Sequence, residues 1–325
     1  MEIATREGWR EFVEMKIPKP AEIPFAVLGR LTPEDRQIYN WARARYSQAG
    51  AFVKTPQFVE FQRAARDRVY LNAHRQVGKL GLILSGEPGQ GKTTTLLQIG
   101  KEHELRRRQT AQPTAAEGWT PVAYVAVPAQ CSAKALLLEF ARFLGLPALS
   151  RATYGILLDT VANALRRCRT ELVLIDDVHH LDLRFRQNIE ASDMLKQLSE
   201  RCGGTFVYAG IAVEETGLLD GTREGQIRKR FELHPASPFR ITTKRGQADW
   251  GDLLLAIEDS LGLLQQPAGQ ILASAKTLHA LTGGEIGPLK DLLQLAALHA
   301  MQDGSETLES ALFESDLKRR QADRV

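Results

Sequence analysis

The sequence predicts an α/β fold in which a parallel sheet of five strands lies between helices. Two observations support this: short apolar runs alternate with helical patterns from Leu80 to Ile241, and the first apolar run ends in a glycine-rich turn that opens a helix. Such alternation is typical of a parallel sheet covered on both faces. No strand pattern follows Ile241, which predicts a small C-terminal domain of helices alone.

Three segments follow from these patterns. They are an N-terminal arm with helices (1–75), an α/β domain (76–245) and a helical domain with a charged tail (246–325). The arm proper, residues 1–31, mixes aromatic residues with prolines without periodicity, so we expect it to be extended. Helix starts follow at Thr32-Pro33 and Thr55-Pro56, and we expect both helices to cover an edge of the sheet.

Apolar runs and helical spacing locate the elements of the α/β domain. We expect strands at 80–85, 122–127, 172–176, 205–209 and from 232 toward 239, and helices at 93–108, 132–144, 154–168, 189–201 and 225–231. In the helical domain, apolar residues recur on one face from Trp250 to Leu261 and on another from Leu289 to Leu298. Ligands of such a sheet bind at the carboxyl ends of its strands.

The composition is that of an ordinary soluble protein. Of 325 residues, 25% are charged and the net charge is +3, so charge alone does not predict a nucleic acid partner and any basic patch has to be local. The chain has no apolar run of 18 residues, no signal-peptide core and three widely spaced cysteines. We therefore expect a cytoplasmic protein with reduced cysteines and no membrane partner.

The turn after the first strand carries the strongest motif. It consists of Gly86, Glu87, Pro88, Gly89, Gln90, Gly91, Lys92 and Thr93, and Thr94 follows it. A strand, a glycine-rich turn, Lys-Thr and a helix in this order form a phosphate-binding P-loop. Its backbone N–H groups point at one anion, and the helix N-terminus adds about half a positive charge. Lys92 then reaches the terminal phosphates and the Thr93 hydroxyl binds Mg²⁺. A loop that merely turns a corner is disfavoured by the flanking strand and helix, so we expect a bound nucleoside triphosphate.

A second acidic motif follows the strand predicted at 172–176. This strand ends in Asp176-Asp177, beside the P-loop strand in the expected sheet. A carboxylate at such a strand tip holds Mg²⁺, and the next residue orients the attacking water. We assign Asp176 to magnesium and Asp177 to the activation of water.

These motifs together resemble an AAA+ ATPase, and in detail the TniB/TnsC family of transposon target-selection regulators of Tn7-like and Tn5053-like elements. The matching segments are Gly86–Thr94, Asp176–Leu181, Leu195–Leu198, Val207–Ile211, Gln226–Phe231 and Leu281–Gly287. The resemblance covers roughly residues 55–300. It implies an AAA+ P-loop NTPase fold with a small C-terminal helical lid, and ATP with Mg²⁺ as the bound cofactors.

The resemblance also implies partners. Related proteins assemble on duplex DNA without sequence specificity, as hexameric or heptameric rings or as helical filaments. They link a TniQ-type target selector to a TniA/TnsB-type transposase. A replication helper of the helicase-loader or origin-binding type would share many of these motifs, and it is the alternative function. A stand-alone signalling NTPase is a third.

Basic residues supply the remaining candidates. By resemblance, Arg228 and Arg230 stand where an arginine finger reaches the γ-phosphate of a neighbouring subunit; the alternative is a solvated basic stretch. The DNA-binding candidates are Lys101, Arg106, Arg107 and Lys134. A solvated helix end is the alternative for the arginines, because consecutive helical residues splay by about 100° and cannot all meet one strand of DNA.

Three positions depart from the family pattern. Asp177 stands where glutamate is usual, and the predicted strand end at 209–211 has no polar sensor side chain. The lid motif Gly284–Gly287 has glycine where related ATPases carry an arginine, which Lys290 could replace from a different angle. We therefore expect tight ATP binding with slow hydrolysis, as suits a switch.

Overall fold

The computed structural model describes residues 2–110, 118–147, 150–181, 186–216 and 230–322. They belong to two compact units. Unit 1 comprises Met1–Met15 and Gln57–Ala236, and unit 2 comprises Lys16–Pro56 and Ser237–Val325. The segment before residue 75, which the sequence presents as one region, therefore contributes to both units.

Unit 1 contains the sheet. Its strands are β1 (Gly81–Ser85), β2 (Val122–Ala126), β3 (Leu172–Asp176), β4 (Thr205–Gly210) and β5 (Phe231–Pro235). In the described part of the chain they form one five-stranded sheet in the order β2-β3-β4-β1-β5, and all neighbours are parallel. The predicted α/β class is confirmed.

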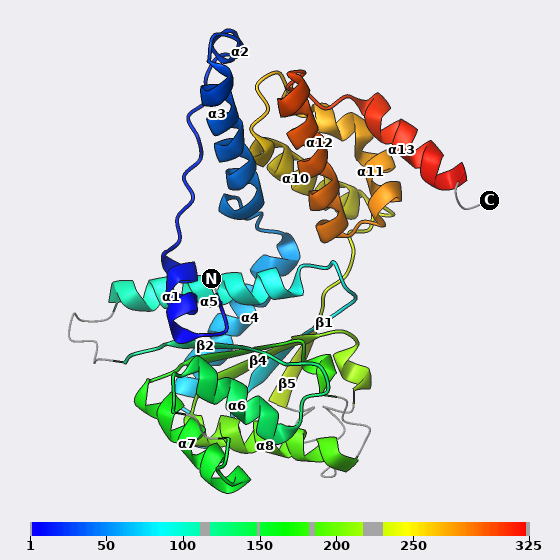
Figure 1. Ribbon diagram of the computed structural model, residues 1–325. Coiled ribbons are helices and arrows are strands. Elements are labelled where there is room, and N and C mark those ends of the chain that lie inside the picture. The colour runs from blue at the N-terminus through cyan, green and yellow to red at the C-terminus, as the bar shows by residue number, and fades with distance from the viewer. Residues whose placement is uncertain (1, 111–117, 148–149, 182–185, 217–229, 323–325) are drawn as a thin grey trace. The chain divides into compact units, whose positions relative to one another are not determined.

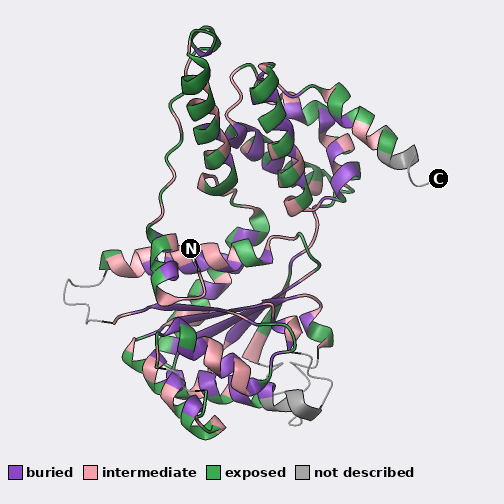
Figure 2. Cartoon of the chain, in the orientation of Figure 1, coloured by how far each residue is buried: buried purple, intermediate pink, exposed green. Residues whose placement is uncertain are grey.

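Helices cover both faces of this sheet. They are α1 (Arg6–Glu14), α4 (Pro56–Ala73), α5 (Lys92–Thr110), α6 (Ala133–Phe143), α7 (Tyr154–Arg167) and α8 (Arg186–Cys202), with short 3₁₀ turns η2 (Val178–His180) and η3 (Val213–Glu215). Helices α1 and α5 lie on one face, and α6, α7 and α8 on the other (Figure 1). Strands β1, β3 and β4 are buried throughout, whereas the edge strand β5 is partly exposed (Figure 2). The helix predicted at 225–231 lies outside the described residues except for its last two positions.

The prediction of an extended arm is wrong for residues 6–14, which form helix α1. Thr5 caps this helix, because its hydroxyl accepts a hydrogen bond from Gly8 N at 3.1 Å. Trp9 and Val13, one turn apart, are both buried. The capping residue and the four-residue spacing were present in the sequence.

Unit 2 is helical. It contains α2 (Phe25–Leu28), α3 (Pro33–Arg45), a π-helical turn η1 (Tyr46–Gly50), α10 (Lys244–Leu261), η4 (Gln270–Ser274), α11 (Ala275–Thr282), α12 (Ile286–Asp303) and α13 (Ser310–Ala322). Its core includes Trp250, Leu254, Leu289 and Leu293 from the two predicted apolar faces. The predicted start of α3 is confirmed, since Thr32 accepts a hydrogen bond from Asp35 N and Pro33 begins the helix.

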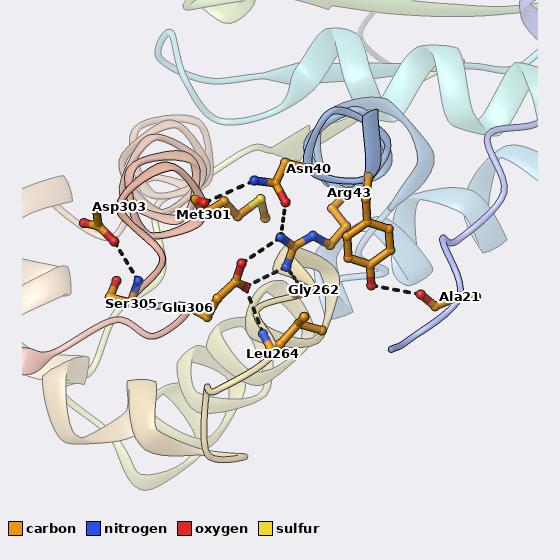
Figure 3. Close-up of polar contacts among 10 residues, drawn as sticks. Ala21, Asn40, Arg43, Gly262, Leu264, Met301, Asp303, Ser305 and Glu306 are labelled. Carbon is orange, nitrogen blue, oxygen red and sulfur yellow. Dashed lines mark hydrogen bonds and ion pairs between the residues drawn. The ribbon is translucent and has the colours of Figure 1, made fainter. Parts of the chain in front are cut away.

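The sequence predicted that helix α3 covers an edge of the sheet, but this helix belongs to unit 2 and the sheet to unit 1. A buried ion pair holds it there: Arg43 donates to both carboxylate oxygens of Glu306, at 2.6 and 2.8 Å, and the two side chains are 3% and 0% exposed (Figure 3). Asn40 adds a hydrogen bond to Met301 O of α12. A buried bidentate pair requires both partners, because either charge alone would be left in an apolar interior.

Within the described residues, no helix combines the length and the apolar character needed to cross a bilayer.

Candidate nucleotide-binding site

The P-loop has the backbone geometry that its sequence predicts. It connects β1 to α5, and Gly86 N donates to Gly210 O at the end of β4. A Cβ at Gly86 would lie 2.1 Å from Ala236 O, so a side chain has no room there. Gly89 and Gly91 have φ of 79° and 74°, in the region that favours glycine. Helix α5 begins at Lys92, so its N-terminal N–H groups point toward the loop.

Lys92 is folded over this loop. Its Nζ donates to Gly86 O and Glu87 O, both at 2.8 Å, and the residue is 9% exposed. Burial lowers the pKa of Lys92, while the carboxylates of Asp176 and Asp177 oppose that shift. An ammonium held by backbone carbonyls beside a nest of N–H groups suits a phosphate ligand.

Asp176 and Thr93 meet at the same edge of the sheet. Asp176 is the last residue of β3 and is 1% exposed. The exposed Thr93, one residue into α5, has its hydroxyl near this carboxylate. Burial raises the pKa of Asp176, and the Thr93 hydroxyl opposes that shift. One carboxylate and one hydroxyl are the oxygen ligands that Mg²⁺ takes together with substrate phosphates, so the residues present fit magnesium. Magnesium bound there would neutralise charge on the phosphates.

Tyr124 is a further partner of Asp176 that sequence reasoning missed. It lies on β2, and its hydroxyl donates to Asp176 Oδ2 at 3.2 Å, while Asp177 N donates to Oδ1 at 3.0 Å. The pairing of Val125 with Ile175 sets β2 beside β3. The alternation of strands and helices in the sequence predicts that β2 and β3 belong to one sheet. It does not predict that the Tyr124 hydroxyl reaches the Asp176 carboxylate.

Asp177 lies directly after β3 in a left-handed conformation, with φ of 55° and ψ of 36°. The histidines that follow it are anchored: His180 Nδ1 donates to Val127 O at 2.8 Å, and Ile211 N donates to His179 Nδ1 at 3.4 Å. Burial, together with the neighbouring His180, lowers the pKa of His179. This agrees with its Nδ1 acting as an acceptor. The role of Asp177 in activating water stays a prediction.

A polar pair lies beside the end of β4. Ser85 Oγ donates to Glu214 Oε2 at 2.5 Å, and Val213 N donates to Ser85 Oγ at 3.0 Å. Residues 209–211 at this strand end have no polar side chain, as the sequence shows, and the carboxylate near it is that of Glu214 in η3. The short turn brings this carboxylate back to the last residue of β1.

Arg230 lies at the amino ends of the strands, whereas Lys92 lies beyond their carboxyl ends. It directly precedes β5, whose first residue Phe231 pairs with Gly81, the first residue of β1. Its guanidinium pairs with Glu200 at 2.5 Å, and Glu200 also accepts a hydrogen bond from Gly78 N. Arg230 is therefore not brought to the P-loop of its own chain. Arg228 lies outside the described residues.

Two of the DNA-binding candidates have partners within the chain. Lys101 donates to Phe12 O and Met15 O at the end of α1. Arg107, in the last turn of α5, donates to Glu171 at 2.9 Å. Any contact of these two side chains with DNA has to compete with those bonds.

The other two candidates are half-buried. Burial lowers the pKa of Arg106, and the positive charge of Arg66 adds to that shift. Lys134 lies in the first turn of α6, beyond the carboxyl end of β2. DNA contact by these four residues stays a prediction.

The lid motif is fixed within unit 2. Gly284 has φ of 78°, and a Cβ there would lie 2.2 Å from Phe239 O, so a side chain has no room at this position. Lys290 donates to Gln48 O at 3.2 Å, and burial lowers its pKa. Its ammonium therefore already has a partner in unit 2.

Comparisons with known proteins agree with this site. A family model described as an AAA domain matches residues 75–219, somewhat less than half of the chain. This stretch contains the P-loop, Asp176 and Asp177. The comparison with curated proteins gave no match.

Solved structures of origin-recognition proteins share the fold. The Aeropyrum pernix ORC1 protein, in complex with DNA, has 15% identity and a TM-score of 0.59, covering 82% of this chain and 66% of that one. The Aeropyrum pernix ORC2 protein, in ADPNP–ADP complexes, has 16% identity and a TM-score of 0.58, covering 86% and 72%. Drosophila ORC bound to DNA has 12% identity and a TM-score of 0.55, covering 96% and 72%. The chain thus spans just under two thirds of the length of the first of these. At such identities the likeness shows the fold alone: this is an α/β fold of the AAA+ type found in origin-recognition proteins.

Proposed function

We propose that this protein is an AAA+ ATPase that uses ATP as the signal for staying on DNA. The observation that carries the proposal is the meeting of Lys92, Thr93 and Asp176 at one edge of the sheet, where the Thr93 hydroxyl lies close enough to the Asp176 carboxylate to act on its pKa. The AAA domain match covers all three residues. ATP with Mg²⁺ is the ligand that this set fits best.

The proposed hydrolysis is slow. Asp177 is one methylene shorter than the usual glutamate, and Lys290, the candidate replacement for a lid arginine, already bonds to Gln48 O. Both features favour a long-lived ATP state. A turnover of tens per second in the presence of DNA would contradict this part of the proposal.

Assembly of several copies completes the proposed site. Arg230 and Lys92 occupy opposite edges of the sheet, so one copy can present Arg230 to the P-loop edge of the next. A head-to-tail contact of this kind repeats, and it closes into a ring of six or seven or continues as a helical filament. Arg228 stands near enough in sequence to share this role.

The proposed track is duplex DNA, bound without sequence specificity. Two of the structures with this fold are described as bound to DNA. Lys134, beyond the carboxyl end of β2, is the candidate contact at the nucleotide edge of the sheet. Lys101, Arg106 and Arg107 are further candidates.

The proposed biological role is the regulation of transposition. The motif resemblance to TniB/TnsC proteins supports it, and a TniQ-type selector and a TniA/TnsB-type transposase would be the partners. A replication helper is the second candidate, and the fold shared with origin-recognition proteins favours it. ATPase assays with each partner separate them: stimulation by a transposase supports the first role, and stimulation by a helicase or origin DNA supports the second.

Electron microscopy tests the shared part of the proposal. We expect rings or filaments on duplex DNA with a non-hydrolysable ATP analogue, and none with Lys92→Ala under the same conditions. Isolated monomers of the wild-type protein with analogue and DNA would contradict the assembly.

A further inference from the structure

Helix α1 is fastened to the P-loop helix by a buried tryptophan. Trp9 is 0% exposed, and its Nε1 donates to Glu104 Oε2 of α5 at 2.5 Å. Gly100, on the same helix, makes room for the ring: a Cβ there would lie 2.7 Å from the Trp9 ring. The contact is therefore specific in shape as well as in hydrogen bonding.

Polar contacts along the segment complete the attachment. Lys101 donates to Phe12 O and Met15 O at 3.1 and 2.9 Å, which caps the C-terminal end of α1. Arg108 pairs with Glu14 at 2.8 Å. Because Lys101 and Arg108 both belong to α5, the helix that begins at Lys92 holds the C-terminal end of α1 through two side chains.

Trp9 also reaches the neighbourhood of the magnesium carboxylate. Its ring stacks on Tyr124, with centroids 6.1 Å apart and planes 14° from parallel. Tyr124 is 7% exposed, so its ring is confined between neighbours. Its hydroxyl, at the far end of the ring, donates to Asp176 Oδ2 at 3.2 Å. A continuous chain of contacts thus runs from α1 to the carboxylate.

The hydrogen bonds that Asp176 accepts fix the orientation of its carboxylate. Asp177 N holds Oδ1 and the Tyr124 hydroxyl holds Oδ2, so the plane of the carboxylate is fixed from two directions. Groups that orient a metal-binding carboxylate in this way affect metal affinity strongly. The Thr93 hydroxyl lies near the same carboxylate and would be the second oxygen ligand of a magnesium ion.

We propose that Tyr124 is a positioning residue for the magnesium carboxylate of Asp176, and that Trp9 acts through it, so that helix α1 is part of the nucleotide site. The proposal rests on the proposed binding of ATP with Mg²⁺. Neither residue touches the ligand. Tyr124 orients Asp176, and Trp9 holds the Tyr124 ring.

The first test compares nucleotide affinity with Mg²⁺ and with EDTA, by titration of a fluorescent ATP analogue. Tyr124→Phe keeps the stacked ring and removes the hydroxyl. We expect the gain in affinity from Mg²⁺ to fall about tenfold, with affinity in EDTA unchanged. The control is Tyr208→Phe, which removes a hydroxyl from a tyrosine that is 2% exposed on β4 and stacks on Phe231. An unchanged Mg²⁺ gain in Tyr124→Phe would overturn the proposal. A wild-type protein without any Mg²⁺-dependent affinity would instead overturn the proposed function.

The second test asks whether Trp9 acts through Tyr124. We expect Trp9→Leu to reduce the Mg²⁺ gain, and the double variant with Tyr124→Phe to lose no more than Tyr124→Phe alone, because both changes break one chain of contacts. Additive losses would overturn the role of Trp9. If Trp9→Leu does not fold, Trp9→Phe replaces it: a smaller ring that loses the bond to Glu104 should still reduce the Mg²⁺ gain, and a full gain would overturn the role.

Discussion

The carboxyl ends of the parallel strands form one edge of the sheet and their amino ends form the other. Polar side chains bond in different ways at these two edges. At the carboxyl edge, Lys92 bonds to backbone carbonyls of the P-loop, and the Thr93 hydroxyl lies near the Asp176 carboxylate, where phosphates and magnesium would bind. At the amino edge, charged side chains pair among themselves: Glu171 accepts from His103 and Arg107.

Amino-edge pairing extends along the sheet. Asn72 of α4 donates to Leu80 O and Thr205 Oγ1 and accepts from Leu80 N, which joins the starts of β1 and β4. Arg230 pairs with Glu200. The side chains named at the carboxyl edge thus surround the place where a nucleotide would bind, whereas those named at the amino edge bond to one another. Similar residue types occur at both edges. Arg230 is the exception that matters most, because its proposed use lies in a neighbouring copy.

The largest expected effect concerns Arg230. If it completes the site of the next copy, Arg230→Ala should lower turnover in the presence of DNA by about 10³-fold. Arg201→Ala is the matched control, since Arg201 belongs to α8 and pairs on the surface with Asp159. Steady-state ATPase assays measure both. Equal turnover in the two variants would place Arg230 among the structural pairs of the amino edge.

The next effect compares two lysines, each of which bonds to two backbone carbonyls. Lys92 does so at the carboxyl edge, and Lys79 donates to Asn72 O and Arg75 O at the amino edge. Lys92→Ala should weaken ATP binding about 10- to 100-fold, the value of a hydrogen bond to a charged group. Lys79→Ala should leave the affinity unchanged. Equilibrium titration with ATP measures both affinities. Similar losses of affinity in the two variants would contradict the proposed difference between the two lysines.

A smaller effect concerns DNA. Lys134 lies at the carboxyl edge, whereas Arg107 is paired with Glu171 at the amino edge. Lys134→Ala should flatten the slope of log K against log salt by about 0.9, the value of one phosphate contact. We expect Arg107→Ala to flatten the slope less than Lys134→Ala does, because any DNA contact of Arg107 has to compete with its bond to Glu171. Binding titrations over a range of salt concentrations measure both slopes, and a change in Arg107→Ala alone would reverse the assignment.

The smallest effect concerns the stability of the amino edge. Burial favours the neutral form of Glu171, but His103 and Arg107 outweigh it and lower its pKa below the ordinary 4.5. The pairing therefore stabilises the fold above about pH 4.5, and this contribution is lost as the pH falls through the lowered pKa. Glu171→Gln should lower the free energy of unfolding by about 0.5–1 kcal/mol at pH 7, since the pair is partly exposed. The difference should shrink as the pH falls below 4.5 and through the lowered pKa. Denaturant unfolding at pH 7 and at a series of lower pH values checks it, and a difference independent of pH would contradict the pairing.

Much of the carboxyl edge followed from the sequence. The P-loop is local, so its glycines, Lys92 and Thr93 could be assigned from spacing alone, and Asp176 followed from its place at a strand end. Tyr124 and Glu214 could not be assigned, because each reaches its partner across the sheet or around a turn. The spacing of strands in the sequence predicts which strands lie near each other, but it does not predict which side chains form a hydrogen bond between them.

The structure of the N-terminal region was harder to predict from the sequence. Thr5 and the Trp9–Val13 spacing signalled a helix, but the nearby prolines and the short length hid the pattern. Helix α3 was assigned to the sheet because it precedes β1 in sequence. The Arg43–Glu306 pair, which joins residues far apart in the chain, holds it in unit 2 instead. Long-range charge pairs of this kind leave no local trace in a sequence.

The most direct test of the central claim is an ATPase assay on mixed subunits. Arg230→Ala retains its own P-loop edge, and Asp177→Asn retains Arg230, so each variant alone should hydrolyse ATP on DNA far more slowly than the wild-type protein. If copies meet head to tail, a 1:1 mixture should recover about a quarter of wild-type turnover, because a quarter of random interfaces join an intact site to an intact Arg230. A mixture no more active than the two variants assayed separately would contradict the claim that one copy completes the site of the next.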